Sequence, residues 1–246
     1  MSSKIEKCVF RCRPTKGELD SRFGRQVVAN LRYGQEMTFE MYEWSEQVRF
    51  HPWIGSNYNN SPHKILLLGD SHHGGEYRSD YTQYAINHHL IEGKKRIRFF
   101  TCIIWTVFGD YTNNIVEEEF NNVAFYNYVQ KLMPDSRMRP SNDDYEAAKM
   151  PFIEVLEKIQ PEFIITFGKA VFDYFPITKD VNKWEEDAAD ETHAVNVNTI
   201  NVCNNSIHVY ALPHPCGNKF NMRIYNCYFS KRGISLNNFI KKAIVR

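Results

Sequence analysis

Lys64-Ile-Leu-Leu-Leu-Gly-Asp70 is the stretch of this sequence that decides the fold. Its four consecutive apolar residues lead directly into Gly69 and Asp70. This pattern is typical of a central strand that is buried on both faces and stops at a functional loop. A second run of this kind, Phe163-Ile-Ile-Thr-Phe167, ends at Gly168. Strands buried on both faces belong to parallel sheets covered by helices, so the two runs predict an α/β fold.

The rest of the chain supplies further elements around these two strands. Residues 123–129 and 207–212 are β-rich runs, and residues 96–107 have the composition of a strand or of a buried helix. Apolar residues at helical spacing predict helices over residues 80–90, 143–159 (with Ser141 or Asn142 as N-cap), 169–174 and 235–244. Alternating strands and helices predict a three-layer α/β/α sandwich around a central, mostly parallel sheet of four to five strands.

Residues 1–60 differ from the rest in composition. They are rich in Arg, Glu, Gln and aromatic residues, and they close with a loop-forming cluster, Gly55-Ser-Asn-Tyr-Asn-Asn-Ser-Pro62. Residues 37–48 have the pattern of a short amphipathic helix. We therefore expect an N-terminal extension, residues 1–60, packed on a main domain, residues 61–246.

The overall composition is that of a globular protein, with 43% hydrophobic and 24% charged residues among 246. The apolar runs are too short to cross a bilayer, and no secretory leader is evident near Met1. Six cysteines without a C-x-x-C pair indicate reduced thiols, so we expect a cytoplasmic protein. We also expect a monomer with no membrane partner. A net charge of +1 requires any nucleic-acid binding to use a local patch.

Three of the expected strands end in polar residues suited to chemistry. The first leads into Asp70, the run over residues 123–129 carries Asn127, and the run over residues 207–212 leads into His214. In open α/β sheets, ligands bind at the carboxyl ends of the strands. We therefore expect these three side chains to converge on one cavity.

In order and separation, these segments resemble the uracil-DNA glycosylase superfamily. The family's first motif is similar to Ile65-Leu-Leu-Leu-Gly69-Asp70-Ser71-His72-His73, and its Asn-bearing strand is similar to residues 123–129, followed by Arg137-Met-Arg-Pro140. The family's helix, Pro and Gly-ended strand are matched by Pro151 to Ala170, and its His-Pro-Ser by His214-Pro215-Cys216. The resemblance covers roughly residues 61 to 245. It implies a DNA glycosylase that acts on an extruded base.

Departures from the family pattern bear on the substrate. Ser71 stands where the uracil-specific enzymes hold a water-directing Asp, and His73 stands where they hold a Tyr that closes the pocket against C5 substituents. Gly74 and Gly75 follow without side chains. The resemblance thus implies either uracil or a bulky C5-modified pyrimidine, including the hypermodified cytosines of phage DNA; the latter would make the enzyme part of antiviral defence. The cysteines of the family's iron–sulfur branch are absent, and we expect no cofactor.

The chemistry of base excision assigns roles to the three converging residues. Cleavage of the N-glycosidic bond builds positive charge on the sugar and negative charge on the base. Asp70 is expected to face the sugar or position the attacking water, and Asn127 to read the base edge as donor and acceptor. His214, charged or neutral, is expected to donate to the base O2. No Lys stands in these motifs as an imine-forming nucleophile, so water is the expected attacker.

Further residues complete the expected site. The expected base pocket contains Ser71, His72, His73, Tyr77 and Phe125, with Tyr77, Tyr81 or Phe125 stacking on the base. The expected DNA contacts are Arg137 and Arg139 on the backbone, Lys219 on phosphate, and Phe220 or Met222 as a wedge in the base stack.

Other interpretations fit the same residues. Ser71 in place of Asp favours a module that binds a nucleotide or modified base without cleaving it, and a hydrolase of free nucleosides is a third class. Taken singly, Asp70 is also a plausible helix cap and Asn127 a plausible partner of a neighbouring loop. A zinc site built from paired histidines lacks ligands at a convincing spacing, so we expect no metal.

Overall fold

A computed structural model describes residues 42–91, 97–109, 119–176 and 185–234 of the chain. The chain divides into two compact units, residues 1–38 and residues 39–246, and every described residue lies in the second. The expected extension, residues 1–60, is therefore described only from residue 42 onward, and the helix expected over residues 235–244 lies outside the described residues.

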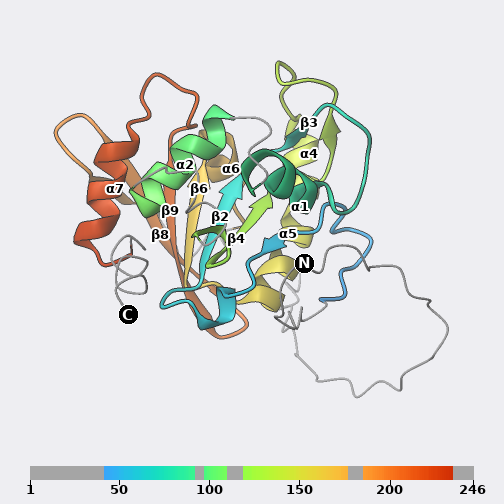
Figure 1. Ribbon diagram of the computed structural model, residues 1–246, viewed down its shortest axis with the longest axis horizontal. Helices are drawn as coiled ribbons and strands as arrows, with labels where there is room; N and C mark the ends of the chain where they lie inside the picture. The colour runs from blue at the N-terminus through green and yellow to red at the C-terminus, as the bar shows by residue number, and fades with distance from the viewer. Residues whose placement is uncertain (1–41, 92–96, 110–118, 177–184, 235–246) are drawn as a thin grey trace, which may run out of the picture. The chain divides into compact units, whose positions relative to one another are not determined.

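The described residues form one large sheet in the order β1-β4-β2-β6-β9-β8-β7 (Figure 1). Its centre is a block of four parallel strands: β4 (Val123–Asn127), β2 (Ile65–Gly69), β6 (Phe163–Phe167) and β9 (Asn205–Leu212). Antiparallel strands extend both edges: β1 (Trp53–Ile54) beside β4, and β8 (Ala194–Val202) and β7 (Glu185–Ala188) beyond β9.

The prediction of an α/β fold with a mostly parallel central sheet is confirmed. The expected number of four to five strands needs correction, because the described sheet has seven. One additional strand, β1, comes from the segment expected to be an extension, and two come from the hairpin of β7 and β8. Both edges are antiparallel, and an antiparallel strand needs only one buried face, so its sequence lacks the continuous apolar run of a central strand.

Helices pack on both faces of the sheet (Figure 1). One core lies between the sheet and α1 (Tyr81–Ile86), the π-helical turn Asn87–Ile91, α2 (Arg98–Phe108) and α7 (Met222–Lys231), and the strands supply residues such as Leu67 and Phe125 to it. The other core lies against α4 (Asn142–Ala147), α5 (Lys149–Ile159) and α6 (Lys169–Asp173), with Leu66 and Leu68 from β2. Neighbouring residues of β2 thus enter different cores, which explains its unbroken apolar run.

The helices agree with the sequence in most places. Ser141 caps α4 in a capping box with Asp144, and Ala148 separates α4 from α5. Residues 96–107 were expected to form either a strand or a buried helix, and the structure shows a helix over residues 98–108. None of the described helices combines the length and the hydropathy needed to span a membrane.

The helix expected over residues 37–48 is not present in its described part, residues 42–48. The backbone N–H and the hydroxyl of Ser45 both donate to the carboxylate of Glu154 on α5. These bonds hold the segment across α5 and take the place of the intrahelical bond of Ser45. Further along the chain, Val48 and Tyr58 belong to the core on the α5 side of the sheet, and Phe50 between them is also completely buried.

The register of the parallel block aligns its strand ends. Gly69 of β2 pairs with Asn127 of β4, and Phe167 of β6 pairs with Leu212 of β9. The chain runs from β2 to β4 on one side and from β6 to β9 on the other, so the direction of the strand order reverses between β2 and β6. The crevice at such a switch point is where α/β sheets bind ligands.

Candidate active site

Asp70 follows β2 at this switch point and is 8% exposed. Its Oδ1 accepts a hydrogen bond of 2.7 Å from the hydroxyl of Tyr145 on α4. Its Oδ2 lies 3.8 Å from Nη1 of Arg139, whose side chain is 67% exposed. Because water screens an exposed ion pair, the buried bond from Tyr145 is the stronger restraint. Asp70 is therefore a carboxylate with one oxygen anchored in the protein and the other turned toward a cation at the surface.

Asn127 ends β4 and lies directly against Gly69. A Cβ atom on Gly69 would be 2.2 Å from Oδ1 of Asn127 and 3.2 Å from Cζ of Phe125. Any side chain at this position would displace the amide of Asn127. Gly69 is therefore the residue that lets Asn127 occupy the strand end.

His72 supports the amide of Asn127 from the other side. The amide nitrogen of Asn127 lies 3.1 Å from Nδ1 and 3.2 Å from Nε2 of His72. An atom this close to both ring nitrogens lies over the face of the imidazole, because in the ring plane it would overlap a ring carbon. Nε2 also forms a hydrogen bond of 2.9 Å with the hydroxyl of Thr82 on α1. Burial, with a smaller effect from His73, lowers the pKa of His72 to about 3, so the ring is neutral.

His214 follows β9 and reaches over the end of β6. A Cβ atom on Gly168 would lie 3.9 Å from Cδ2 of His214, and the ring centroid of Phe99 is 5.6 Å from that of His214. Burial lowers the pKa of His214, Arg139 and His73 lower it further, and Asp70 raises it. Electrostatic interaction therefore links His214 to Asp70, so these two predicted residues lie in one neighbourhood.

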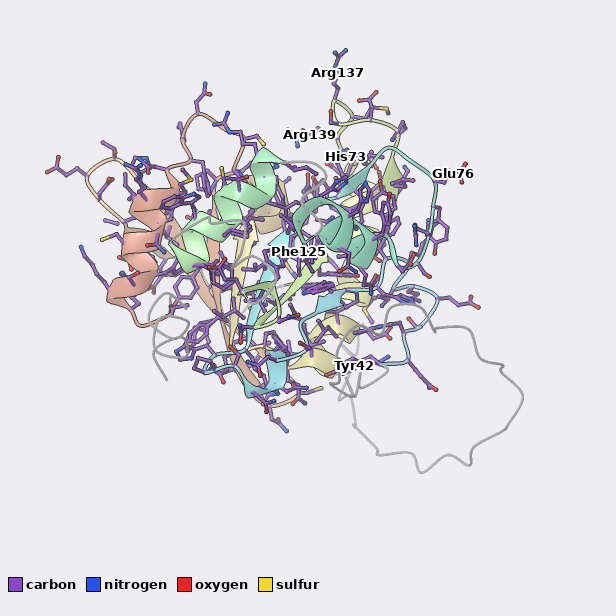
Figure 2. The ribbon with its side chains drawn as sticks, viewed as in Figure 1. Tyr42, His73, Glu76, Phe125, Arg137 and Arg139 are labelled. Atoms are coloured by element: carbon purple, nitrogen blue, oxygen red, sulfur yellow. The ribbon has the colours of Figure 1, made fainter. Side chains whose placement is uncertain are left out.

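His73 is held by the loop that follows β5 (Leu132–Met133), and β5 itself pairs with β3 (His72–His73). Nδ1 of His73 lies 2.9 Å from the carbonyl oxygen of Asp135, so this nitrogen carries a proton and donates. Nε2 lies 3.3 Å from Oγ of Ser71, which donates to it when the ring is neutral. In Figure 2, Arg137 points outward at the tip of the loop, whereas Arg139 lies closer to His73.

Two predicted pocket residues, Phe125 (labelled in Figure 2) and Tyr77, differ in their exposure to solvent. Phe125 shares a strand face with Asn127, as expected, but is 1% exposed and packs against Phe99 and Phe100 in the core. Tyr77 is 50% exposed, and its ring contacts Phe50 at a centroid distance of 5.5 Å. Phe125 is therefore a core residue behind Gly69, and Tyr77 is a surface residue whose ring packs on Phe50.

The loop after His214 has one exposed and one packed candidate for DNA contact. Lys219 is exposed. Phe220 is partly buried, with its ring 5.2 Å from that of Tyr225 and 6.3 Å from that of Phe167. In this arrangement Phe220 anchors the loop to the core, and Lys219 faces solvent.

The structure adds residues that the sequence did not single out. Tyr145 and Thr82 bond to Asp70 and His72, and Gln130 donates to the carbonyl oxygen of Asn127 at 2.9 Å. Thr82 and Gln130 are buried in the structure, but polar residues such as Gln83 and Lys131 stand next to them in the sequence, so no sequence signal marked them. Tyr145 has no such signal either, since an aromatic residue on the inner face of a helix is expected in any core.

Comparison with known proteins adds no identity. No protein-family model matches the chain, and a search of curated proteins finds no match either. Within the described part of the chain, no three His, Cys, Asp or Glu side chains gather as a set of metal ligands. The geometry of the strand ends is therefore the basis for a functional assignment.

Proposed function

We propose that this protein is a monofunctional DNA glycosylase with the three-layer α/β/α fold of the uracil-DNA glycosylase superfamily. It extrudes a uracil or a C5-modified pyrimidine from DNA and hydrolyses the N-glycosidic bond, leaving an abasic site. The supporting observation is that Asp70, Asn127 and His214 follow or end strands of the parallel block whose ends are aligned.

Asp70 is the group that acts on the sugar. Its anchored position leaves Oδ2 available to face the positive charge that develops on the deoxyribose or to orient the attacking water. Arg139 beside Oδ2 is suited to holding a flanking phosphate, which would bring the anionic DNA strand to the edge of the site.

Asn127 and His214 are the groups that act on the base. A side-chain amide offers both a donor and an acceptor to the edge of an extruded pyrimidine. His214 with its lowered pKa is neutral at neutral pH and can donate from one nitrogen to the oxygen on which negative charge develops. A neutral donor avoids the cost of burying a second charge beside the leaving base.

The surroundings of His73 favour a base with a substituent at C5. His73 is engaged by Ser71 and by the carbonyl of Asp135, so its ring has two partners within the protein. Gly74 and Gly75 follow with φ of +67° and +76°, and neither carries a side chain. Among the described residues, the nearest atom to a Cβ on Gly74 would be the carbonyl oxygen of Pro134 at 4.0 Å, so a C5 substituent has room there, whereas the ring of Tyr81 occupies the space beside Gly75.

The decisive experiment measures base release from oligonucleotides that carry uracil or different 5-substituted cytosines, in single and double strands, with mass detection of the released base. Asp70→Asn, Asn127→Ala and His214→Ala are each expected to slow release by about 10²-fold or more. Glu186→Gln, which changes an exposed carboxylate on β7, serves as the control. Equal rates for all the variants would refute the assignment.

A second candidate is a module that binds the same nucleotide without cleaving it. The observation that favours it is Ser71, whose hydroxyl engages His73 and which offers no second carboxylate for directing water. This candidate predicts tight, selective retention of modified DNA with no released base in the same assay.

A further inference from the structure

Tyr145 is a buried tyrosine whose hydroxyl reaches Asp70, 75 positions earlier in the chain. It is 4% exposed, and the oxygen–oxygen distance is 2.7 Å. A carboxylate only accepts hydrogen bonds, so the phenol is the donor. Burial, followed by the contact with Asp70, raises the pKa of Tyr145, so the phenol keeps its proton.

The sequence around Tyr145 fixes where its ring can lie. Ser141 and Asp144 close the capping box of the first turn of α4, and Lys131 binds Asp144 with an N–O distance of 3.0 Å. The ring of Tyr145 stacks on that of Tyr174 at 4.9 Å with an interplanar angle of 9°. Cap, ion pair and stack together leave the ring little freedom to turn away.

The same short segment also reaches the second oxygen of Asp70. Arg139 lies just before the cap, and its Nη1 is 3.8 Å from Oδ2. Pro140, between Arg139 and Ser141, is buried and restricts the backbone there. Residues 139–145 therefore contact the carboxylate from both sides, with a neutral donor inside and a cation outside.

We propose that Tyr145 is a positioning residue that holds Asp70 with Oδ1 toward the protein and Oδ2 toward the substrate. The proposal rests on the glycosylase function proposed above. A carboxylate without this bond would turn more freely about its Cα–Cβ and Cβ–Cγ bonds, and the oxygen that faces the substrate would lose its fixed position. The bond selects one orientation before the substrate arrives, which is the kind of preorganisation on which a charge-stabilising group depends.

Tyr145→Phe removes the hydroxyl and keeps the ring stack. We expect the single-turnover rate of base release to fall by about 10- to 100-fold, with the Kd for DNA changed by less than about twofold. The matched control is Tyr228→Phe on α7, which removes the hydroxyl of a buried tyrosine that donates to Oδ2 of Asp187 at 2.8 Å. This control is expected to retain the rate, so a loss of equal size in both variants would contradict the proposal.

A double-variant cycle separates positioning from a general structural effect. If Tyr145 acts through Asp70, Tyr145→Phe will slow an Asp70→Ala protein, which has no side-chain acceptor at this position, by less than about twofold. A further loss as large as in the wild-type background would overturn the proposal, because Tyr145 would then act independently of the carboxylate.

Urea unfolding of the same four proteins provides a readout that does not depend on catalysis. Coupling predicts that the midpoint shift of the double variant is smaller than the sum of the single shifts. Additive shifts would overturn the proposed hold on Asp70, whatever the wild type does to DNA. A wild type that releases no base from any oligonucleotide while the shifts remain coupled would refute the glycosylase function and support the hold on Asp70.

Discussion

The backbone N–H of Cys216 donates a hydrogen bond of 3.2 Å to Nδ1 of His214. Nδ1 is thereby an acceptor, so the proton of the neutral ring resides on Nε2. The loop that makes this bond is itself held to the fold, since Sγ of Cys102 on α2 lies 3.7 Å from the carbonyl oxygen of Pro215. The short turn after β9 therefore determines which nitrogen of His214 can donate to a ligand.

This tautomer leads to a prediction about pH. Because the pKa of His214 is lowered, kcat/KM for base release should be constant above pH 6.5 and fall only in more acidic solution. Arg139 contributes to the lowering, so Arg139→Gln should raise the pKa of His214 and move the acid limb to higher pH. The pH profile of kcat/KM checks this.

Arg137→Gln is the control for that experiment, since Arg137 is an exposed arginine on the same loop. The pH at which its acid limb falls should match that of the wild type. An acid limb that stays in place or moves to lower pH in Arg139→Gln would show that His214 does not set the limb.

His72 predicts a pH dependence of stability. Its pKa is about 3 in the folded protein and 6.5 in the unfolded chain, so the unfolded state binds the extra proton between these values. The free energy of unfolding should fall by about 1.4 kcal/mol for each pH unit below 6.5, or roughly 2 kcal/mol by pH 5. Urea titrations of the wild type and of His72→Gln at pH 7 and pH 5 measure the difference in slope.

The matched control for His72 is His208→Gln, because His208 is an exposed histidine on β9. The free energy of unfolding of His208→Gln should fall between pH 7 and pH 5 by as much as that of the wild type. In His72→Gln this fall should be smaller by about 2 kcal/mol. Identical losses on acidification in wild type and His72→Gln would mean that the buried ring takes up its proton in the folded state.

Gly69→Ala tests how closely the two strand ends approach. Its Cβ would lie 2.2 Å from Oδ1 of Asn127, so we expect a folded protein that is destabilised by about 1–3 kcal/mol and slowed by about 10²-fold in base release. Adding Asn127→Ala removes the contact and should restore part of the stability but none of the activity. Thermal unfolding and single-turnover rates distinguish these effects, and an active Gly69→Ala protein would exclude a strict position for Asn127.

Lys219 and Phe220 are adjacent residues with different predicted effects. Lys219→Ala should leave the stability unchanged and reduce the slope of log Kd for DNA against log salt by about one unit. Phe220→Ala removes a partly buried ring that packs on Phe167 and should destabilise the fold by about 2 kcal/mol. Salt titrations and urea unfolding of both variants check the pair; an unchanged slope in Lys219→Ala would remove this loop from the DNA interface.

The parallel block was predictable from the sequence because its strands are buried on both faces. β2 and β6 each appear as an unbroken apolar run ended by Gly69 or Gly168. The hairpin of β7 and β8 escaped prediction for the opposite reason. Asn and Thr interrupt the apolar residues of Ala194–Val202, and the preceding strand, Glu185–Ala188, is mostly acidic. Such strands lie at an antiparallel edge, where one face remains in contact with water.

The strand ends were predictable as a group, but the partners of each side chain were not. Parallel strands bring their carboxyl ends to one edge of the sheet. The location of Asp70, Asn127 and His214 at this edge was therefore predictable once the strands that precede them were recognised. Tyr145 depends on how α4 packs against β2, and no local pattern encodes that packing. Phe220 is an aromatic residue in the loop after His214, which is why it was predicted to insert into the DNA base stack. In the structure its ring packs against that of Tyr225.

The side chains at the strand ends pack against two different cores, one on each side of the sheet. Asp70 is braced through Tyr145 by the core of α4, α5 and α6, whereas Asn127 and His214 rest on Phe125 and Phe99 beside the core of α2 and α7. Substitutions in the first core would thus affect Asp70 first, and substitutions in the second would affect Asn127 and His214 first. Laboratory evolution toward a different base should accordingly accumulate its compensating changes behind α2 and α7, while the α4 side stays under purifying selection.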